Sequence, residues 1–240
     1  MIAGFIITGS ASKDVVVRGM GPSLGNAGIS GALADPMLEL RGSDGVLIMG
    51  NDDWKDNQRA LIEGTIYQPT DDRESVIVAT LQPGAYTAIL IGKNQTTGVG
   101  LVEVYDNNQA VNSQLANIST RGLVQTQSNV MIGGFILGGN NNTRVAVRGI
   151  GPSLGQFGVT NFLADPTLEL HDGNGLLLMA NDNWQDDTVS AGQLTANGLG
   201  LQDSHESGIV TSLPPGAFTT ILAGKNGIMG VGLVEIYTLP

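Results

Sequence analysis

The chain has 240 residues, of which 22 are acidic and 11 are basic, so its formal net charge at pH 7 is -11. This charge repels phosphate backbones, and because the basic residues form no cluster we expect no nucleic-acid partner. The sequence has no cysteine, which excludes disulfides, thiolate metal sites and cysteine nucleophiles. No apolar run approaches the roughly 18 residues that a transmembrane helix needs, so we expect no membrane-spanning helix.

Short apolar runs alternate with turn residues along the whole chain, which contains 35 glycines and 9 prolines. Runs rich in Val, Ile, Leu or Thr predict strands, and in the first half they lie at 4–8, 14–18, 37–40, 46–49, 75–81, 85–91 and 99–105. The Gly-Ser-Asp-Gly run at 42–45 and the Pro-Gly pair at 83–84 indicate hairpin turns. Only 23–27 and 57–63 suggest helical turns.

The second half of the chain repeats the first. Residues 1–6, 17–25, 33–36 and 51–54 return 130 positions later, and after an insertion of two residues 92–94 and 98–105 return 132 positions later. Such tandem modules are typical of binding, spacing and assembly proteins, whereas an enzyme rarely carries its reactive centre twice. Each copy is long enough to enclose a core. The sequence therefore predicts an all-β fold of two tandem β-sandwich domains of jelly-roll or Greek-key type.

The segment that joins the copies has no counterpart ahead of the first copy. Residues 107–114 are polar and predict a linker, whereas 115–120 alternate like a strand. We therefore divide the chain into module 1 at 1–106, a linker at 107–114 and module 2 at 115–240, in which 115–130 form an N-terminal strand extension. The chain also begins inside a strand-like run that the second copy carries in mid-chain, so we expect it to derive from a longer precursor.

A polar loop occurs in both copies, as Asn-Asp-Asp-Trp-Lys-Asp-Asn at 51–57 and Asn-Asp-Asn-Trp-Gln-Asp-Asp at 181–187. Carboxylate and amide oxygens at such close spacing suit Ca²⁺, which takes six to eight oxygen ligands. The alternative is that these residues end a strand and cap the following turn. The spacing differs from that of an EF-hand loop.

The two tryptophans, Trp54 and Trp184, follow the acidic residues of this loop. An exposed indole stacks on a sugar face, which would make each module a carbohydrate-binding unit. The commoner role of a single tryptophan at a strand end is to close one edge of a sandwich core.

Residue types used in catalysis are sparse and unevenly shared. Both histidines, His171 and His205, lie in the second copy, where the first has Arg41 and Arg73. Carboxylate pairs of the kind used in sugar hydrolysis are offered by Glu39 with Glu103 and by Glu169 with Glu235, but exposed strand positions explain them equally well. We therefore expect no enzymatic activity.

An arginine ends one apolar run in each copy and is followed by Gly-x-Gly-Pro-Ser-Leu. We expect Arg18 and Arg148 to pair with a carboxylate such as Asp35 or Asp165, or to donate to loop carbonyls. The glycines predict tight turns, because a proline follows the second glycine and no strand-helix-strand unit surrounds them.

Several motifs of the second copy together resemble the pre-peptidase C-terminal domain family: 164–170, 172–175, 181–184, 213–219 and 230–232. This resemblance covers most of each copy and implies a β-sandwich of the kind appended to secreted bacterial hydrolases. Some domains of this family bind calcium. Carried onto this sequence, the resemblance implies calcium ligands at Asp52, Asp53, Asp182 and Asp186. The chain departs from the family's usual setting because no catalytic domain accompanies the pair.

These observations predict a non-enzymatic, exported structural or adhesive protein, extracellular or at the cell surface, and stabilised by calcium. If 115–130 complete a sheet of module 2, module 1 exposes an edge where that strand is missing. Exposed edges recruit strands from other chains, so we expect a homo-oligomer or a filament. The alternatives are a pair of carbohydrate-binding modules that hold a polysaccharide through Trp54 and Trp184, and an accessory domain of a larger secreted hydrolase.

Overall fold

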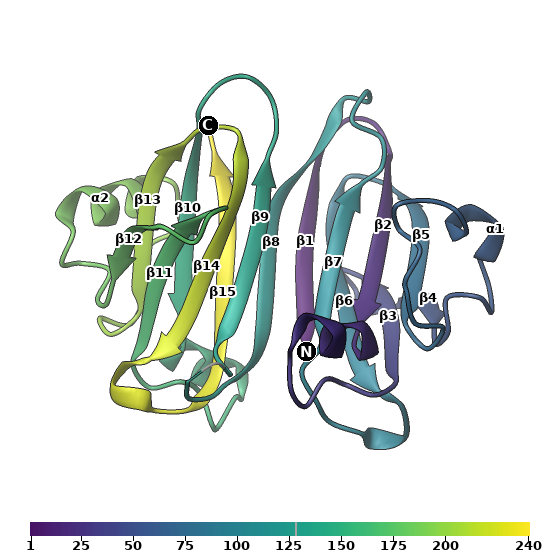
Figure 1. Cartoon of the computed structure of the whole chain (residues 1–240). Coiled ribbons are helices and arrows are strands. Elements are labelled where there is room, and N and C mark those ends of the chain that lie inside the picture. Colours follow the sequence, from purple (N-terminus) through teal and green to yellow (C-terminus); the bar gives the residue numbers. More distant parts are fainter. Residues whose placement is uncertain (128) are drawn as a thin grey trace. The chain divides into compact units, whose positions relative to one another are not determined.

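A computed structural model of the chain describes residues 1–127 and 129–240 (Figure 1). The chain divides into two compact units, Met1–Ala116 and Asn117–Pro240. Strands pair antiparallel in both units, and helices are short. The predicted all-β, jelly-roll-like sandwich class is confirmed.

Unit 1, Met1–Ala116, packs two sheets on one core. Its strands are β1 (Ile2–Gly9), β2 (Lys13–Met20), β3 (Pro36–Gly42), β4 (Leu47–Asn51), β5 (Ser75–Leu81), β6 (Gly84–Gly92) and β7 (Leu101–Asp106), and its helix is α1 (Arg59–Ile62). One sheet contains the strand order β1-β6-β3-β4, and the other is three-stranded in the order β5-β2-β7. The strands predicted from apolar runs all occur.

Unit 2, Asn117–Pro240, repeats this arrangement with one strand more. Its elements are β9 (Met131–Leu137), β10 (Thr143–Ile150), β11 (Pro166–Asp172), β12 (Leu177–Asn181), α2 (Thr188–Ala196), β13 (Ser207–Leu213), β14 (Gly216–Gly224) and β15 (Gly230–Leu239). The sheet β12-β11-β14-β9 matches β4-β3-β6-β1 of unit 1. The other contains β13-β10-β15-β8, in which β8 (Ser113–Val124) adds a strand that the unit 1 sheet β5-β2-β7 lacks.

Strand β8 contributes to both the sheet and the core of unit 2. Residues 117–124 pair antiparallel with β15, from Asn117 opposite Tyr237 to Val124 opposite Gly230. Val124 is fully buried in the core cluster of unit 2, against which Ile118 also packs. The strand begins at Ser113, two residues inside the segment predicted as a linker, and ends at Val124, before the predicted end of the extension at residue 130.

Both faces of β2 are covered, which explains its unbroken apolar run. Val15 and Val17 are buried in the sandwich core, whereas Val16 on the opposite face packs with Trp54 and Ile62. A strand covered on both faces reads as a continuous hydrophobic run instead of an alternating one. The segment that carries α1 thus closes the outer side of the sheet β5-β2-β7.

The Gly-x-Gly-Pro-Ser-Leu motif forms a 3-10 turn held by a buried glutamate. In unit 1 the turn is Pro22–Ala27, and the Gly21 and Ser23 N–H groups donate to Glu74 Oε1 at 3.1 and 3.0 Å. Glu206 accepts the same bonds from Gly151 and Ser153 in unit 2. Both glutamates are fully buried, and a buried carboxylate needs such donors because its desolvation is costly.

Replacing Val124 by alanine tests whether β8 is part of the folded core of unit 2. Removing two buried methyl groups and leaving a cavity should lower the free energy of unfolding by about 2 kcal/mol. Leu123, on the other face of the strand, is 56% exposed, so Leu123→Ala is the matched control and should change little. Urea denaturation followed by circular dichroism measures both, and equal stabilities of the two variants would contradict this role of β8.

Candidate functional site

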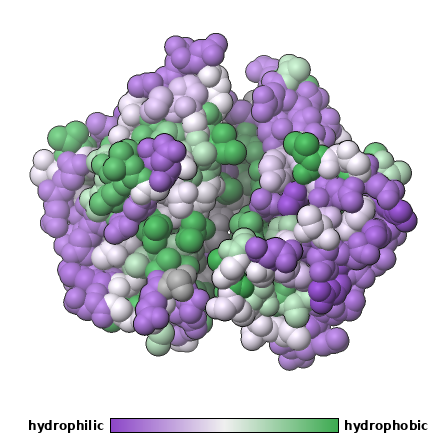
Figure 2. All heavy atoms as spheres, viewed as in Figure 1, coloured by the Kyte–Doolittle hydropathy of each residue, from purple (hydrophilic) through white to green (hydrophobic). Residues whose placement is uncertain are grey.

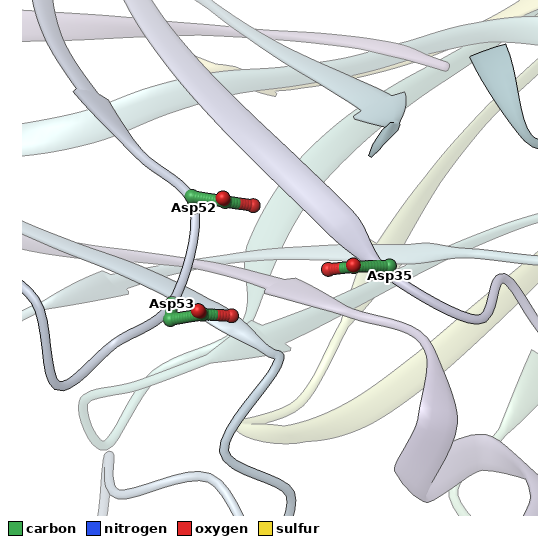
Figure 3. A group of neighbouring side chains, drawn as sticks. All are labelled: Asp35, Asp52 and Asp53. Atoms are coloured by element: carbon green, nitrogen blue, oxygen red, sulfur yellow. The ribbon is translucent and has the colours of Figure 1, made fainter. Parts of the chain in front are cut away.

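The predicted cation site of unit 1 gathers three carboxylates at one end of the sandwich. Asp35 precedes β3, Asp52 and Asp53 follow β4, and one oxygen of each lies within 4.8 Å of the others. Figure 3 shows the three side chains directed toward one another. They meet because β3 and β4 pair antiparallel, with Leu38 opposite Asn51, which brings the start of one strand beside the end of the other.

A lysine ammonium already partly neutralises this cluster. Lys93 Nζ lies 2.5 Å from Asp52 Oδ2 and 3.9 Å from Asp35 Oδ2. The Asp52 carboxylate raises the pKa of Lys93, while burial, and then the neighbouring Asp52 charge, raise the pKa of Asp53. The Oδ1 atoms of all three aspartates are buried and have no hydrogen-bond partner among the described residues. The site therefore holds three carboxylates against one ammonium, with oxygens still available to a cation.

Unit 2 keeps the lysine but has fewer acids at the same place. Lys225 Nζ lies 2.6 Å from Asp182 and 3.7 Å from Asp165, and Asn183 stands where unit 1 has Asp53. Asp186 accepts a hydrogen bond from Asn183 Nδ2 at 3.1 Å.

The structure therefore brings together only part of the predicted calcium set. Within residues 1–127 and 129–240, the one group of three acidic side chains close enough to hold an ion contains Asp52 and Asp53 but neither Asp182 nor Asp186. It also contains Asp35, which we expected to pair with an arginine. The sequence signal that would have found Asp35 is the Asp-Pro pair repeated ahead of a strand in both copies, at 35–36 and 165–166.

The sugar-stacking role predicted for the tryptophans does not fit their burial. Trp54 is 1% exposed and Trp184 is 9% exposed. Trp54 packs with Val16 and Ile62, and only an edge of Trp184 reaches an open depression beside α2. The indoles are therefore buried, but on the outer side of a sheet in each unit and not at an edge of the sandwich core, where the alternative interpretation placed them.

The two arginines pair with different carboxylates from those expected, and each also donates to a loop carbonyl, at Ile66 or at Leu199, as the alternative expectation held. Arg18 Nε lies 2.9 Å from Glu103, and Arg148 pairs with Glu235, its counterpart. The reason is register, since Arg18 on β2 lies opposite Glu103 on β7. Asp35 and Asp165 bind lysines instead.

The candidate catalytic residues do not meet in one site, because each pairs with a different neighbour. Glu39 binds Arg41 on the same strand, so Glu39 and Glu103 belong to separate ion pairs. His171 lies 2.9 Å from Glu169, which raises the pKa of the imidazole, and His205 contacts Asp203 in a turn. The two histidines lie in separate contacts.

Six strands end their sheets with an outer edge that no strand of the described chain covers: β4, β5, β7, β9, β12 and β13. Two of them are β7 in the three-stranded sheet of unit 1 and β9 in the four-stranded sheet of unit 2. Strand β9 carries no charged residue and no proline, and its outward side chains Ile132 and Ile136 are 56% and 79% exposed. An uncharged, apolar edge of this kind lacks the features that usually prevent strand addition.

Exposed aliphatic side chains also recur at matching hairpins of the two units. The hairpin of β3 and β4 exposes Val46, Leu47 and Ile48, and the hairpin of β11 and β12 exposes Leu176, Leu177 and Leu178. Figure 2 shows hydrophobic residues gathered over the region of unit 2 where Figure 1 draws β12 and β14. Apolar groups that gather on a surface often mark sites of interaction.

Comparison with known proteins yields remote structural matches alone. No protein-family model matches the chain, and no curated protein matches its sequence. The resemblance to the pre-peptidase C-terminal domain therefore stays a prediction.

The structural matches include a quasi-atomic model of the PBCV-1 virus capsid, with 8% identity, a TM-score of 0.25 and coverage of 99% of this chain and 93% of that one. The major capsid protein P2 from bacteriophage PM2 has 8% identity, a TM-score of 0.24 and coverage of 100% and 93%. A putative secreted protein from Eubacterium rectale has 7% identity, a TM-score of 0.24 and coverage of 99% and 68%. At these values the matches say nothing about activity or partners.

Among the described residues, no helix has the length and apolar character needed to cross a membrane.

Replacing Lys93 by methionine tests whether the acidic cluster holds a cation. In a chelating buffer this variant should melt a few degrees below the parent chain, because three carboxylates lose their ammonium partner. Millimolar Ca²⁺ should then restore part of the loss, since an ion that binds the folded state alone raises its melting temperature. Differential scanning calorimetry measures both effects.

Lys225→Met is the matched control, because Asn183 leaves unit 2 with one acid fewer. Calcium should raise the melting temperature of Lys225→Met by less than it raises that of Lys93→Met. If the Lys93→Met chain melts at the same temperature in calcium and in chelator, the cluster does not bind calcium.

Proposed function

We propose that the chain is a non-enzymatic structural or adhesive protein, exported from the cell, that associates through the exposed edges of its sheets. The observation that carries the proposal is the inequality of the two units: the sheet edge that β8 covers on β15 in unit 2 is uncovered on β7 in unit 1. Unpaired backbone N–H and C=O groups along an edge are a template for a strand of another chain.

The character of β9 supports the same proposal from the other unit. Its seven residues present two exposed isoleucines and no charge at a sheet edge. Native edges are commonly protected by lysine, proline or a bulge, and β9 has neither of the first two. The recurring aliphatic hairpins add apolar surface that a partner would bury.

The two edges differ in sequence and lie in different units, which bears on the kind of assembly. A contact between unlike surfaces is heterologous, and unless its rotation closes a ring it propagates as a filament. We therefore propose a head-to-tail assembly in which the uncovered edge of one unit receives a strand from a neighbouring chain.

The proposal also includes export from the cell and a structural calcium ion. Export to the cell exterior is supported by the resemblance to secreted sandwich modules and is compatible with a chain that has no cysteine. Calcium at the cluster of Asp35, Asp52 and Asp53 would act as a structural ion that ties the start of β3 to the end of β4.

Light scattering over a wide concentration range tests the association. The parent chain should gain mass with concentration, and Ile136→Lys should shift this gain to concentrations at least about tenfold higher, because a lysine on an edge must be desolvated for pairing. Ile66→Lys is the matched control, since Ile66 is 82% exposed in a turn outside the strands, and it should behave like the parent chain. A parent chain that stays monomeric throughout, with both units folded, would sink the proposed function.

A further inference from the structure

A small cavity opens in unit 1 beside the first residues that lead into β7. It has a volume of about 190 Å³ and is lined by Met1, Leu33, Leu90, Gly92, Thr96, Thr97, Gly98 and Gly100. All these residues except the two threonines have counterparts of the same type in unit 2, at Met131, Leu163, Leu222, Gly224, Gly230 and Gly232. The same lining therefore occurs twice in the chain.

In unit 2 a side chain fills this place. A Cβ atom added at Gly232 would lie 3.1 Å from Val124 Cγ2 and 2.7 Å from Leu222 Cδ2. Added at Gly100, the counterpart, it would meet Leu90 Cδ2 at 2.5 Å, Met20 O at 3.5 Å and Leu33 Cδ2 at 3.6 Å, and none of these three nearest atoms belongs to a strand in the position of β8. The cavity of unit 1 is therefore the socket that Val124 occupies in unit 2.

The surrounding residues show the same difference in burial. Met131 is 7% exposed beside β8, whereas Met1 is 42% exposed. Val234 is fully buried, but its counterpart Val102 is only partly buried. The environment of β7 thus lacks the cover that one strand supplies to β15.

The backbone also differs between the two units at this place. β15 begins at Gly230, where β8 pairs with it, while β7 begins only at Leu101, three residues later in the matched numbering. On its paired side Val99 bonds to the loop at Gly31 and Leu33, as Val231 bonds to Asn161 and Leu163. The side of 98–100 that corresponds to the β8 side of β15 has no strand among the described residues.

We propose that the groove along 98–104 is an acceptor site for an extended peptide strand with the sequence pattern of β8, supplied by another chain. The inference rests on the proposed function in taking β7 as an edge used for association, and it names the acceptor and the chemistry of the donor. By equivalence with unit 2, the donor runs antiparallel to β7. Its valine enters the socket opposite Gly98, and its glycine lies opposite Gly100.

The pattern that the groove selects can be taken from the buried face of β8. Ile118, Thr120, Gly122 and Val124 alternate along that face, opposite Ile236, Val234, Gly232 and Gly230. A Cβ added at Gly122 would lie 3.5 Å from Met131 Cε, so a larger residue there would press on the methionine. The donor therefore needs aliphatic or small residues at alternate positions. Its arginine at 121 also gives it a positive charge toward a chain whose net charge is -11.

A labelled peptide of residues 117–126, added to the full chain, tests the acceptor by fluorescence anisotropy. The parent peptide should bind saturably. The peptide carrying Val124→Asp should bind at least roughly tenfold more weakly, because the socket would bury an unpaired carboxylate. The peptide carrying Leu123→Asp places the same charge one residue away, on the outward face, and should bind nearly as well as the parent. Equal affinity of the two aspartate peptides, or no binding of the parent peptide, would overturn the proposal.

Hydrogen exchange locates the bound peptide on the full chain. The amides of 98–104 that do not already bond to β2 or to the loop at Gly31 should become protected, whereas those of 230–236, which β8 already covers, should not change. Protection confined to 230–236 would mean that the peptide replaces β8 in unit 2, and this would overturn the acceptor in unit 1.

Failure of the acceptor and failure of the proposed function have different signatures. A chain that gains mass with concentration but does not bind the peptide associates through another surface, which removes the acceptor alone. A chain that binds the peptide at 98–104 but remains monomeric keeps the acceptor and loses self-association.

Discussion

The pairing of β8 with β15 is the constraint on which the difference between the two units depends. The strand satisfies the outer edge of β15 and delivers Val124 into the core between Leu222 and Gly232. Two requirements of a sandwich are met by one segment, since edge N–H and C=O groups need partners and packed cores contain few voids larger than a water molecule. Where the strand is absent, both the edge and the cavity remain.

Nearly identical sequences therefore end in different environments. Gly98 and Gly100 match Gly230 and Gly232 in type and spacing, yet only the second pair lies within a strand. A side chain at Gly98 or Gly230 would meet the backbone at 32–33 or 162–163, so this close approach is the same in both units. Beside Gly232 the side chain of Val124 from β8 packs, whereas Gly100 lines the cavity of unit 1. An internal duplication thus supplies the template from which a binding site can be inferred.

Ionic groups serve mainly to fasten the ends of strands. Glu74 and Glu206 hold the 3-10 turns by accepting backbone N–H bonds, and Lys93 and Lys225 neutralise aspartates where paired strands meet. Each of the two fully buried carboxylates, Glu74 and Glu206, is thus committed to backbone donors of its own unit. The cluster with Asp53 differs, since it keeps an excess of negative charge and carboxylate oxygens without donors.

Much of the secondary structure follows from the sequence by itself. The apolar runs and their turns determined the strands of both copies, because side-chain alternation and glycine punctuation act locally. The unequal segment after residue 106 likewise marked the extra strand, although its bounds shifted to Ser113 and Val124 once pairing set them. The sequence of the acidic loop also predicted two residues of the carboxylate cluster, Asp52 and Asp53.

Only the tertiary structure decided which distant residues meet. The repeated Asp-Pro pair marks Asp35 but not its neighbours, because antiparallel register brings it beside Asp52. Glu74 was not predictable as the acceptor for the 3-10 turn, because its partner Gly21 lies far along the chain. The tryptophans could not be placed inside or outside until the segments around them covered the sheets. The sequence by itself determined that two similar sandwiches form, since local pattern suffices for that. The tertiary structure decided that β15 is covered and β7 is exposed, because both depend on the position of β8.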